Sequence, residues 1–388
     1  MRTASNRMSQ IPFSGIREVL EAVEDLEARG EDVIRLEIGR PDFDTPTHIK
    51  AAATQALGEG KVHYSSNYGI PDLRASIAEK LQRENQLDFD PSDEVVVTTG
   101  AVEAVFITMM GLLNPNDEVL IMDPFWPSYG PCTVMAGASP ISVPLRISNG
   151  FQPAIEDITS RITERTRMIV INTPHNPTGT TLDITVLEAL SQIAIENDLL
   201  VLSDEIYEKI IYDDVVHTSI ASLPGMRRRT ITINGLSKAY AMTGWRIGYL
   251  AADRSIVRSV VRVRQNTTAC STTFSQWGAL AALRGDQGNV THMVSEFDRR
   301  RHLVVSALND MRRVRVVEPS GAFYVMPDIS EFGSTSGEFC LDLLAQTGVA
   351  IVPGTAFGSF GEGLVRISYA NSYENLEKAM QRIAGFLA

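Results

Sequence analysis

Apolar runs rich in β-forming residues alternate with helical stretches along most of this chain. Six runs are predicted to be strands, at residues 94–98, 118–122, 168–172, 199–203, 229–234 and 247–251. Strands that are apolar throughout are typical of a sheet buried on both faces, and helices between consecutive strands supply the cover. The pattern therefore predicts an α/β fold, in which a three-layer large domain contains a mostly parallel sheet.

The C-terminal part of the chain follows a different pattern. After about Arg284, a long arginine-rich helical segment precedes short predicted strands around residues 314–317 and 323–326, and further helices are predicted from Ser336 and over residues 374–386. A chain of 388 residues also exceeds the roughly 250 to 300 residues at which a single core stops growing. A second, smaller α+β domain is therefore expected.

Near the N-terminus, apolar residues recur at helical spacing from Ile16, with Ser14 placed to cap the helix and Gly30 placed to end it. We expect three segments along the chain. Residues 1–45 form an N-terminal arm and part of the small domain, residues 46–285 form the large domain, and residues 286–388 form the C-terminal small domain.

Composition excludes several classes of function. The net charge of -12 disfavours binding to nucleic acid or to a membrane surface. No apolar run reaches the roughly 18 residues that a membrane span needs. Three cysteines without a CxxC spacing fit reduced thiols better than a disulfide framework. A soluble, cytoplasmic protein without a metal site is expected.

Three segments that follow predicted strands carry candidate binding residues. In TTGAVEAVF, residues 98–106, a turn at Gly100 precedes a helix predicted to begin near Val102, and a helix N-terminus suits phosphate. Trp126 in DPFWPSY either belongs to the core or stacks on a flat ring. Asn176 in NTPHNPTG either forms a turn or donates to a ligand at the carboxyl edge of the sheet.

Three charged residues stand in apolar surroundings. Asp204 ends an apolar run, where it either caps a helix or pairs with a cation such as a protonated pyridine nitrogen. Lys238 lies among apolar residues of GLSKAYAMTGWRIGY, where desolvation would lower its pKa and make the amine nucleophilic. Arg366, between Val365 and Ile367, binds either a structural carboxylate or the carboxylate of a substrate.

The order and spacing of these motifs closely resemble the fold-type-I, class I/II aminotransferases that depend on pyridoxal 5'-phosphate (PLP), including the aspartate, aromatic and kynurenine enzymes. The resemblance covers nearly the whole chain. It also includes GRPDFDTP (residues 39–46), HYSSNYGIPDLR (residues 63–74) and VPGTAFG (residues 352–358). It implies the PLP-dependent transferase fold, with the large domain binding PLP, and transfer of an amino group from an L-amino acid to a 2-oxo acid through pyridoxamine phosphate.

The resemblance also implies roles for individual residues. Lys238 would hold PLP as a Schiff base and act as general acid and base, and Asp204 would keep the pyridine nitrogen protonated. Tyr207 and Asn176 would bind the phenolic oxygen of PLP. Further cofactor contacts are implied for Gly100, Ala101, Val102, Trp126, Ser237 and Arg246. Arg366, with Gly39 and Asn176, would bind the substrate α-carboxylate. Tyr64 would reach the phosphate of a neighbouring subunit, which implies a homodimer with shared active sites.

Departures from the family pattern concern the substrate. Bacterial aspartate-specific relatives carry a lysine that helps to bind the distal carboxylate, and the matching position here is Val102. An apolar or aromatic donor is therefore preferred over aspartate, with Phe13, Ser14, Gly15 and Val102 as candidate pocket residues. Relatives often carry glutamate where this chain has Arg40. Arg40 either faces a substrate anion or forms a surface salt bridge, which is the simpler interpretation.

Two alternative functions remain open at this stage. The same residues and cofactor also serve elimination, cyclisation or oxidase chemistry in divergent relatives, because the fate of the carbanion depends on bond alignment. A keto product without a matching amino acceptor would indicate such chemistry. A non-catalytic PLP-binding regulator would need a DNA-binding segment, and the acidic chain shows none before Ser14.

Overall fold

A seven-stranded sheet forms the centre of the larger lobe. The structure is a computed structural model, and it describes residues 4–11 and 15–388. The strand order is β2-β8-β7-β6-β5-β3-β4, in which β3 to β7 are mutually parallel and β8 runs antiparallel to both of its neighbours. The strands are β2 (Val95–Thr98), β3 (Glu118–Asp123), β4 (Ser139–Pro144), β5 (Thr166–Asn172), β6 (Leu200–Asp204), β7 (Thr230–Gly235) and β8 (Gly248–Ala251).

All six predicted strands are confirmed, with ends that differ by at most two residues. Strand β4 was not predicted, because Pro140 and Pro144 interrupt its apolar pattern. Proline is tolerated there because β4 lies at the edge of the sheet, where one side of the backbone needs no ladder partner.

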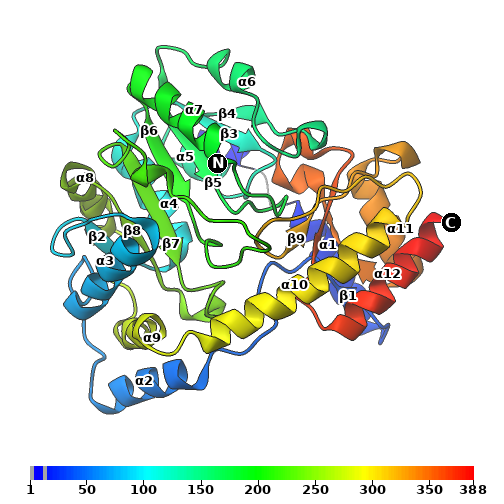
Figure 1. Cartoon of the computed structure of the whole chain (residues 1–388), viewed down its shortest axis with the longest axis horizontal. Coiled ribbons are helices and arrows are strands. Elements are labelled where there is room, and N and C mark those ends of the chain that lie inside the picture. The colour runs from blue at the N-terminus through cyan, green and yellow to red at the C-terminus, as the bar shows by residue number, and fades with distance from the viewer. Residues whose placement is uncertain (1–3, 12–14) are drawn as a thin grey trace.

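Both faces of the sheet are covered by helices, as Figure 1 shows. Neighbouring residues of one strand enter different cores: Leu120 packs with Ile169 and Val201, whereas Ile121 packs with Leu202. This alternation confirms the three-layer arrangement. The covering helices are α3 (Pro71–Asn85), α4 (Gly100–Leu112), α5 (Tyr129–Met135), α6 (Ile155–Thr159), α7 (Ile184–Glu196), α8 (Arg254–Gln265) and α9 (Thr273–Arg284). Helix α2 (Thr47–Gly58) packs against α9.

The smaller lobe combines segments from both ends of the chain. Its sheets are β1 with β10, which are parallel, and the antiparallel β11-β12-β9. The elements are α1 (Ile16–Ala28), β1 (Ile34–Arg35), α10 (Gly288–Asn309), β9 (Tyr324–Val325), α11 (Ser336–Thr347), β10 (Val349–Ala350), β11 (Val352–Pro353), β12 (Val365–Ser368) and α12 (Tyr373–Leu387).

Short 3-10 helices occur in both lobes. They are η1 (Asn6–Gln10), η2 (Ile147–Asn149), η3 (Ile220–Ser222), η4 (Thr243–Trp245), η5 (Ser330–Phe332), η6 (Gly354–Phe357) and η7 (Ser359–Gly361).

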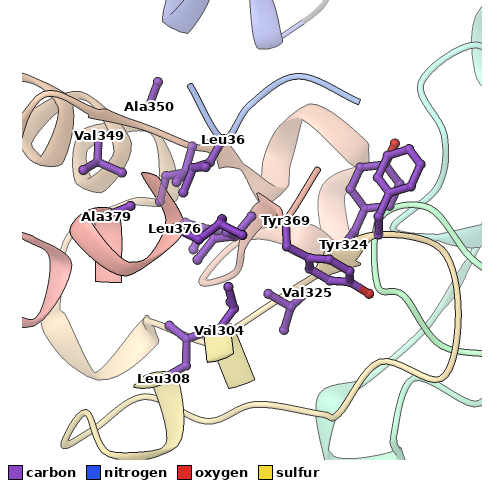
Figure 2. Close-up of a cluster of buried hydrophobic side chains, with 14 of the residues drawn as sticks. Leu36, Val304, Leu308, Tyr324, Val325, Val349, Ala350, Tyr369, Leu376 and Ala379 are labelled. Carbon is purple, nitrogen blue, oxygen red and sulfur yellow. The ribbon is translucent and has the colours of Figure 1, made fainter. Parts of the chain in front are cut away.

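A buried cluster of the smaller lobe joins residues that are far apart in the sequence. Leu36 packs with Val304 and Val325 and with Leu376 and Ala379 of α12, as Figure 2 shows. The pairing of Ile34 with Val349 adds a backbone connection between the two ends of the chain. These contacts support the proposed boundaries at residues 45/46 and 285/286, which stay a prediction.

Two features expected of these segments have different outcomes in the structure. The predicted strand at 314–317 is wrong: this stretch forms only an isolated bridge between Arg315 and Asp328, although its three valines are partly buried against the hydrophobic cores. The cap proposed at Ser14 lies outside the described residues, whereas helix α1 itself is confirmed.

Three consecutive arginines of α10 are ion-paired, and two of them are buried. Arg299 pairs with Glu296, Arg300 also contacts Asp42, and Arg301 lies buried beside Asp298. None of the described helices is both long and apolar enough to cross a membrane.

Candidate active site

A cavity of about 1200 Å³ opens where the carboxyl ends of β5 and β6 face the smaller lobe. Loops at this edge of a parallel sheet are the usual place for ligands in α/β proteins. Most of the predicted site residues line it, namely Gly39, Ala101, Val102, Trp126, Asn176, Asp204, Tyr207, Ser237, Lys238, Arg246 and Arg366. Gly100 lies directly behind Arg246, and Tyr64 does not line the cavity.

Lys238 lies in the loop between β7 and β8, with its amine inside the protein. The Nζ atom donates a hydrogen bond to the Gly39 carbonyl at 2.6 Å. Burial, with the nearby charges of Arg366 and Arg246, lowers the pKa of this amine to about 8. A sizeable fraction of the amine is therefore neutral near physiological pH, which is the state that attacks a carbonyl carbon.

Asp204 is the last residue of β6 and is 4% exposed. Its Oδ2 atom accepts a hydrogen bond from Tyr129 Oη at 2.7 Å, and its Oδ1 atom accepts one from the Ile206 amide at 3.2 Å. Burial raises the pKa of this carboxyl to about 6, against the opposing effect of the two hydrogen bonds. A turn rather than a helix follows Asp204, so the helix-cap interpretation is wrong.

No lysine or arginine forms an ion pair with Asp204 within the part of the chain that the structure describes. Because a buried carboxylate without a cation is costly, the site favours a positively charged partner in the cavity. A protonated ring nitrogen meets that requirement.

Arg246 and the start of α4 form an anion-binding corner of the cavity. Helix α4 begins at Gly100, two residues before the predicted start, and its first backbone N–H groups have no partner within the helix. A Cβ atom at Gly100, where φ is +77°, would lie 2.9 Å from Arg246 Cζ. Glycine therefore lets the guanidinium approach the helix terminus, and together they suit a phosphate.

Arg366 of β12 is a buried cation without a carboxylate. Its Nη1 atom donates to Asn176 Oδ1 at 3.1 Å, and Nη2 donates to the Glu37 carbonyl at 2.6 Å. The Nε atom is buried and has no hydrogen-bond partner. Among the described residues Arg366 forms no ion pair, so the structural-ion-pair interpretation is wrong. An anion that enters the cavity would complete its coordination.

Two tyrosines that sequence reasoning missed complete the site. Tyr129 holds Asp204, and its ring meets Trp126 edge-on at 5.2 Å between centroids. Tyr324 shares a hydrogen bond of 2.9 Å with Tyr207 and lies under the Arg366 guanidinium, 4.5 Å from Cζ to the ring centroid. Tyr129 follows Trp126 by three residues in DPFWPSY, but no sequence signal connects it with Asp204.

Two of the four residues expected to line the pocket for the substrate side chain are found in the cavity wall. Gly15 and Val102 line the cavity, and Val102 is 42% exposed. Phe13 and Ser14 lie outside the described residues. Tyr64 is 92% exposed, so within a single chain it contacts none of the site.

Comparison with known proteins identifies the family. The model of the aminotransferase class I and II family matches residues 31–383. The chain belongs to this family. The aminotransferase is 46% identical over 381 residues to the aspartate aminotransferase of Pyrococcus abyssi, a match that covers 98% of this chain and 97% of the relative. It is 44% identical over 381 residues to aromatic-amino-acid aminotransferase 2 of Thermococcus litoralis, with the same coverage.

Among solved structures, the aspartate aminotransferase from Thermus thermophilus with maleate superposes with a TM-score of 0.95 at 39% identity, over 100% of both chains. The predicted fold and family resemblance are therefore confirmed. As a class I/II enzyme, the aminotransferase depends on PLP and transfers an amino group between an amino acid and a 2-oxo acid.

The residues present fit PLP. The cavity offers a buried amine at Lys238, a buried carboxylate that lacks a cation at Asp204, and an anion-binding corner at Arg246. These groups match the aldehyde, the ring nitrogen and the phosphate of the cofactor.

Proposed function

We propose that this aminotransferase takes the amino group from L-amino acids with apolar or aromatic side chains, and that the cavity described above is its active site. The observation that carries the proposal is the apolar character of the walls beyond Lys238. They include Ile16, Leu20, Ile38, Val102, Phe106, Phe125, Trp126, Met135 and Phe357. An apolar side chain that packs against these walls gains burial free energy, whereas a carboxylate that packs against them would lose its hydration.

The proposal assigns the cofactor to residues of the large lobe. Lys238 would carry it covalently, Asp204 would pair with its ring nitrogen, and Trp126 would stack on its ring. The phenolic oxygen would be bound by Tyr207 and Asn176, and the phosphate by Ser237, Arg246 and the amides of Gly100, Ala101 and Val102. When bound, the cofactor supplies an aromatic ring that accepts the electron pair left on the substrate carbon as the proton leaves.

The chain's own residues then bind the substrate and move the proton. Arg366 would bind the α-carboxylate, because its buried guanidinium has an unpaired Nε atom and no acidic partner among the described residues. Asn176, already bonded to Arg366, and Gly39 would complete this contact. Once the substrate amine has displaced Lys238 from the cofactor, the freed Nζ atom would take the proton from the α-carbon, since its lowered pKa of about 8 leaves part of the amine neutral and able to act as a base.

The experiment that tests the donor class is a half-reaction. Aromatic, aliphatic and acidic L-amino acids are each added to the holoenzyme without a 2-oxo acid, and conversion of the cofactor to pyridoxamine phosphate is followed by absorbance. We expect phenylalanine, tyrosine or leucine to react about tenfold or more faster than aspartate, because one buried apolar side chain contributes a few kcal/mol.

An internal control for Arg366 uses phenethylamine, which equals phenylalanine without its carboxylate and should react far more slowly. Faster conversion by aspartate than by every apolar donor would contradict the proposed donor class.

We also propose that the enzyme is a homodimer in which Tyr64 reaches the phosphate-binding corner of a second copy. The support is that Tyr64 is 92% exposed and Val62 is 55% exposed, which is unusual for residues of these types. Sedimentation should give twice the mass of one chain, and Tyr64→Phe should weaken PLP binding about tenfold, as one lost phosphate contact does. A fully active monomer would contradict this proposal.

The enzyme is further proposed to work in the cytoplasm. Cys132, Cys270 and Cys340 are free cysteines, which suits a reducing compartment.

A further inference from the structure

Among the described residues, four basic side chains line the cavity, although the chain as a whole carries a net charge of -12. Lys238, Arg246 and Arg366 each have a proposed role, in binding the cofactor or the α-carboxylate. The fourth is Arg40. Within residues 4–11 and 15–388, the acidic residues of the cavity wall are Glu37 and Asp204. The cavity is thus a basic region of an acidic protein. Of the basic groups that the described part of the chain places there, Arg40 is the one to which the reaction assigns no role.

Arg40 is exposed, and it makes no ion pair or hydrogen bond with any residue in the described ranges 4–11 and 15–388. The surface salt bridge considered for it from sequence is therefore absent from the described part of the chain. The carboxylates nearest to it in sequence are occupied by other cations. Glu37 pairs with Arg35 at 2.8 Å, and Asp42 pairs with Arg300 at 2.8 Å.

Arg40 is also close to the reacting centre along the backbone. Gly39, the preceding residue, accepts the hydrogen bond from Lys238 Nζ at 2.6 Å. Consecutive Cα atoms are about 3.8 Å apart, so the long arginine side chain starts within a few ångströms of the carbonyl that holds the amine. Its planar guanidinium can bind a carboxylate through two parallel hydrogen bonds.

A transaminase must accept two substrates in turn in one cavity. The apolar wall suits the proposed donor, but it offers no partner for the second carboxylate of a dicarboxylic acid. We propose that Arg40 is a specificity-determining residue that binds the distal carboxylate of dicarboxylic substrates, with a dicarboxylic 2-oxo acid as the amino acceptor. This inference rests on the proposed active site and deepens it.

In this arrangement the two carboxylates of the acceptor are held by two different arginines. Arg366 is buried and binds the carboxylate shared by every substrate, whereas Arg40 is exposed and binds only the second carboxylate. An apolar donor leaves Arg40 in water, where a free guanidinium costs nothing. Since Arg40 is exposed, its attraction for a dianion should weaken as salt is added.

The test measures binding of unreactive acids to the holoenzyme by calorimetry. The probes are succinate and glutarate, which carry two carboxylates, and 3-phenylpropionate, which carries one and an apolar group. The proteins are wild type, Arg40→Gln, Arg40→Lys and Arg228→Gln. Arg228 is a matched control, because it is exposed and without an ion pair or hydrogen bond among the described residues, but does not line the cavity.

We expect Arg40→Gln to weaken dicarboxylate binding about tenfold or more relative to 3-phenylpropionate, as loss of one charge-assisted contact does. Arg40→Lys should retain part of the preference, because it keeps the charge and loses the planar fork. Raising the salt concentration should reduce the preference of the wild type, and Arg228→Gln should leave it intact.

An unchanged ratio of the dissociation constants in Arg40→Gln would overturn the inference. An equal loss of affinity for all three acids in Arg40→Gln would also overturn it. The same holds if the substitution changes the subunit assembly and leaves this ratio unchanged. These outcomes are distinguishable from failure of the proposed donor class, which is measured on the wild type alone by the half-reaction with aromatic donors.

Discussion

Lys238→Ala is expected to reduce the rate of amino-group transfer by at least about 10,000-fold, since it removes both a nucleophile and a proton carrier. No other lysine of the described ranges lines the cavity. Tyr207 and Tyr324 lie nearby, but burial raises the pKa of both hydroxyl groups, so neither can replace an amine as a base at neutral pH. Addition of a small external amine should restore part of the activity, because the space vacated by the side chain is open to the cavity.

The measurements are the steady-state rate and the visible absorbance of bound PLP. In the variant the absorbance should return to that of free cofactor. Lys378→Ala is the matched control, because Lys378 is an exposed residue of α12 outside the cavity. Substantial turnover by the Lys238→Ala variant without an added amine would refute the assignment of Lys238.

The PLP-free protein provides a second readout for Lys238. Its pKa of about 8 lies below the ordinary value of 10.5, so the unfolded chain binds more protons between these pH values. Stability of the wild type should therefore rise as pH increases from about 8 to 10.5. Lys238→Ala should lose this contribution to the pH dependence, and at pH 7 the variant should unfold at a denaturant concentration no lower than the wild type.

Asp204→Asn is expected to reduce the transfer rate about 100- to 1,000-fold, the effect of removing one electrostatic contact from a buried active site. Asparagine keeps the shape of the side chain and can still accept the hydrogen bond from Tyr129 Oη. It lacks the negative charge that would hold a proton on the ring nitrogen. The loss should appear mainly in kcat, because the substrate itself does not contact Asp204 in the proposed site.

Asp198→Asn is the matched control for Asp204. Asp198 lies just before the other end of β6, has a side chain that is 87% exposed, and pairs with Arg229 at 3.3 Å. This control should keep nearly full activity. Equal activity of Asp204→Asn and the wild type would show that the carboxylate does not serve the cofactor.

The pH dependence of the PLP-free protein separates a folding defect from a chemical one. Burial raises the folded-state pKa of Asp204 to about 6, so between about pH 4 and 6 the folded protein holds a proton that the unfolded chain has released. This group therefore contributes stability at low pH that is lost as pH rises through that range. Asp204→Asn should lack this contribution, which denaturant titrations at pH 4.5 and 7 can measure.

Local sequence patterns determined the elements of this fold and several of the residues at its centre. The central strands could be predicted because each apolar run is bounded by turn-forming residues, and because burial on both faces requires continuous apolar residues. Lys238, Asp204 and Arg366 were conspicuous because a charged residue in an apolar run needs a partner. Edge strand β4 was missed, because its position at the edge of the sheet, which tolerates its two prolines, is not visible in the sequence.

Only the tertiary structure decided which side chains meet. The contacts from Tyr129 to Asp204 and from Arg366 to Asn176 join residues 75 and 190 positions apart, and the contact from Arg366 to the Glu37 carbonyl spans 329 positions. The tertiary structure also decided that neither Arg366 nor Arg40 has an acidic partner within the part of the chain that it describes. Both arginines line the cavity. The physical reason is that periodicity and turn chemistry act between neighbours in the sequence, whereas pairing and desolvation depend on distances that only the packed lobes establish.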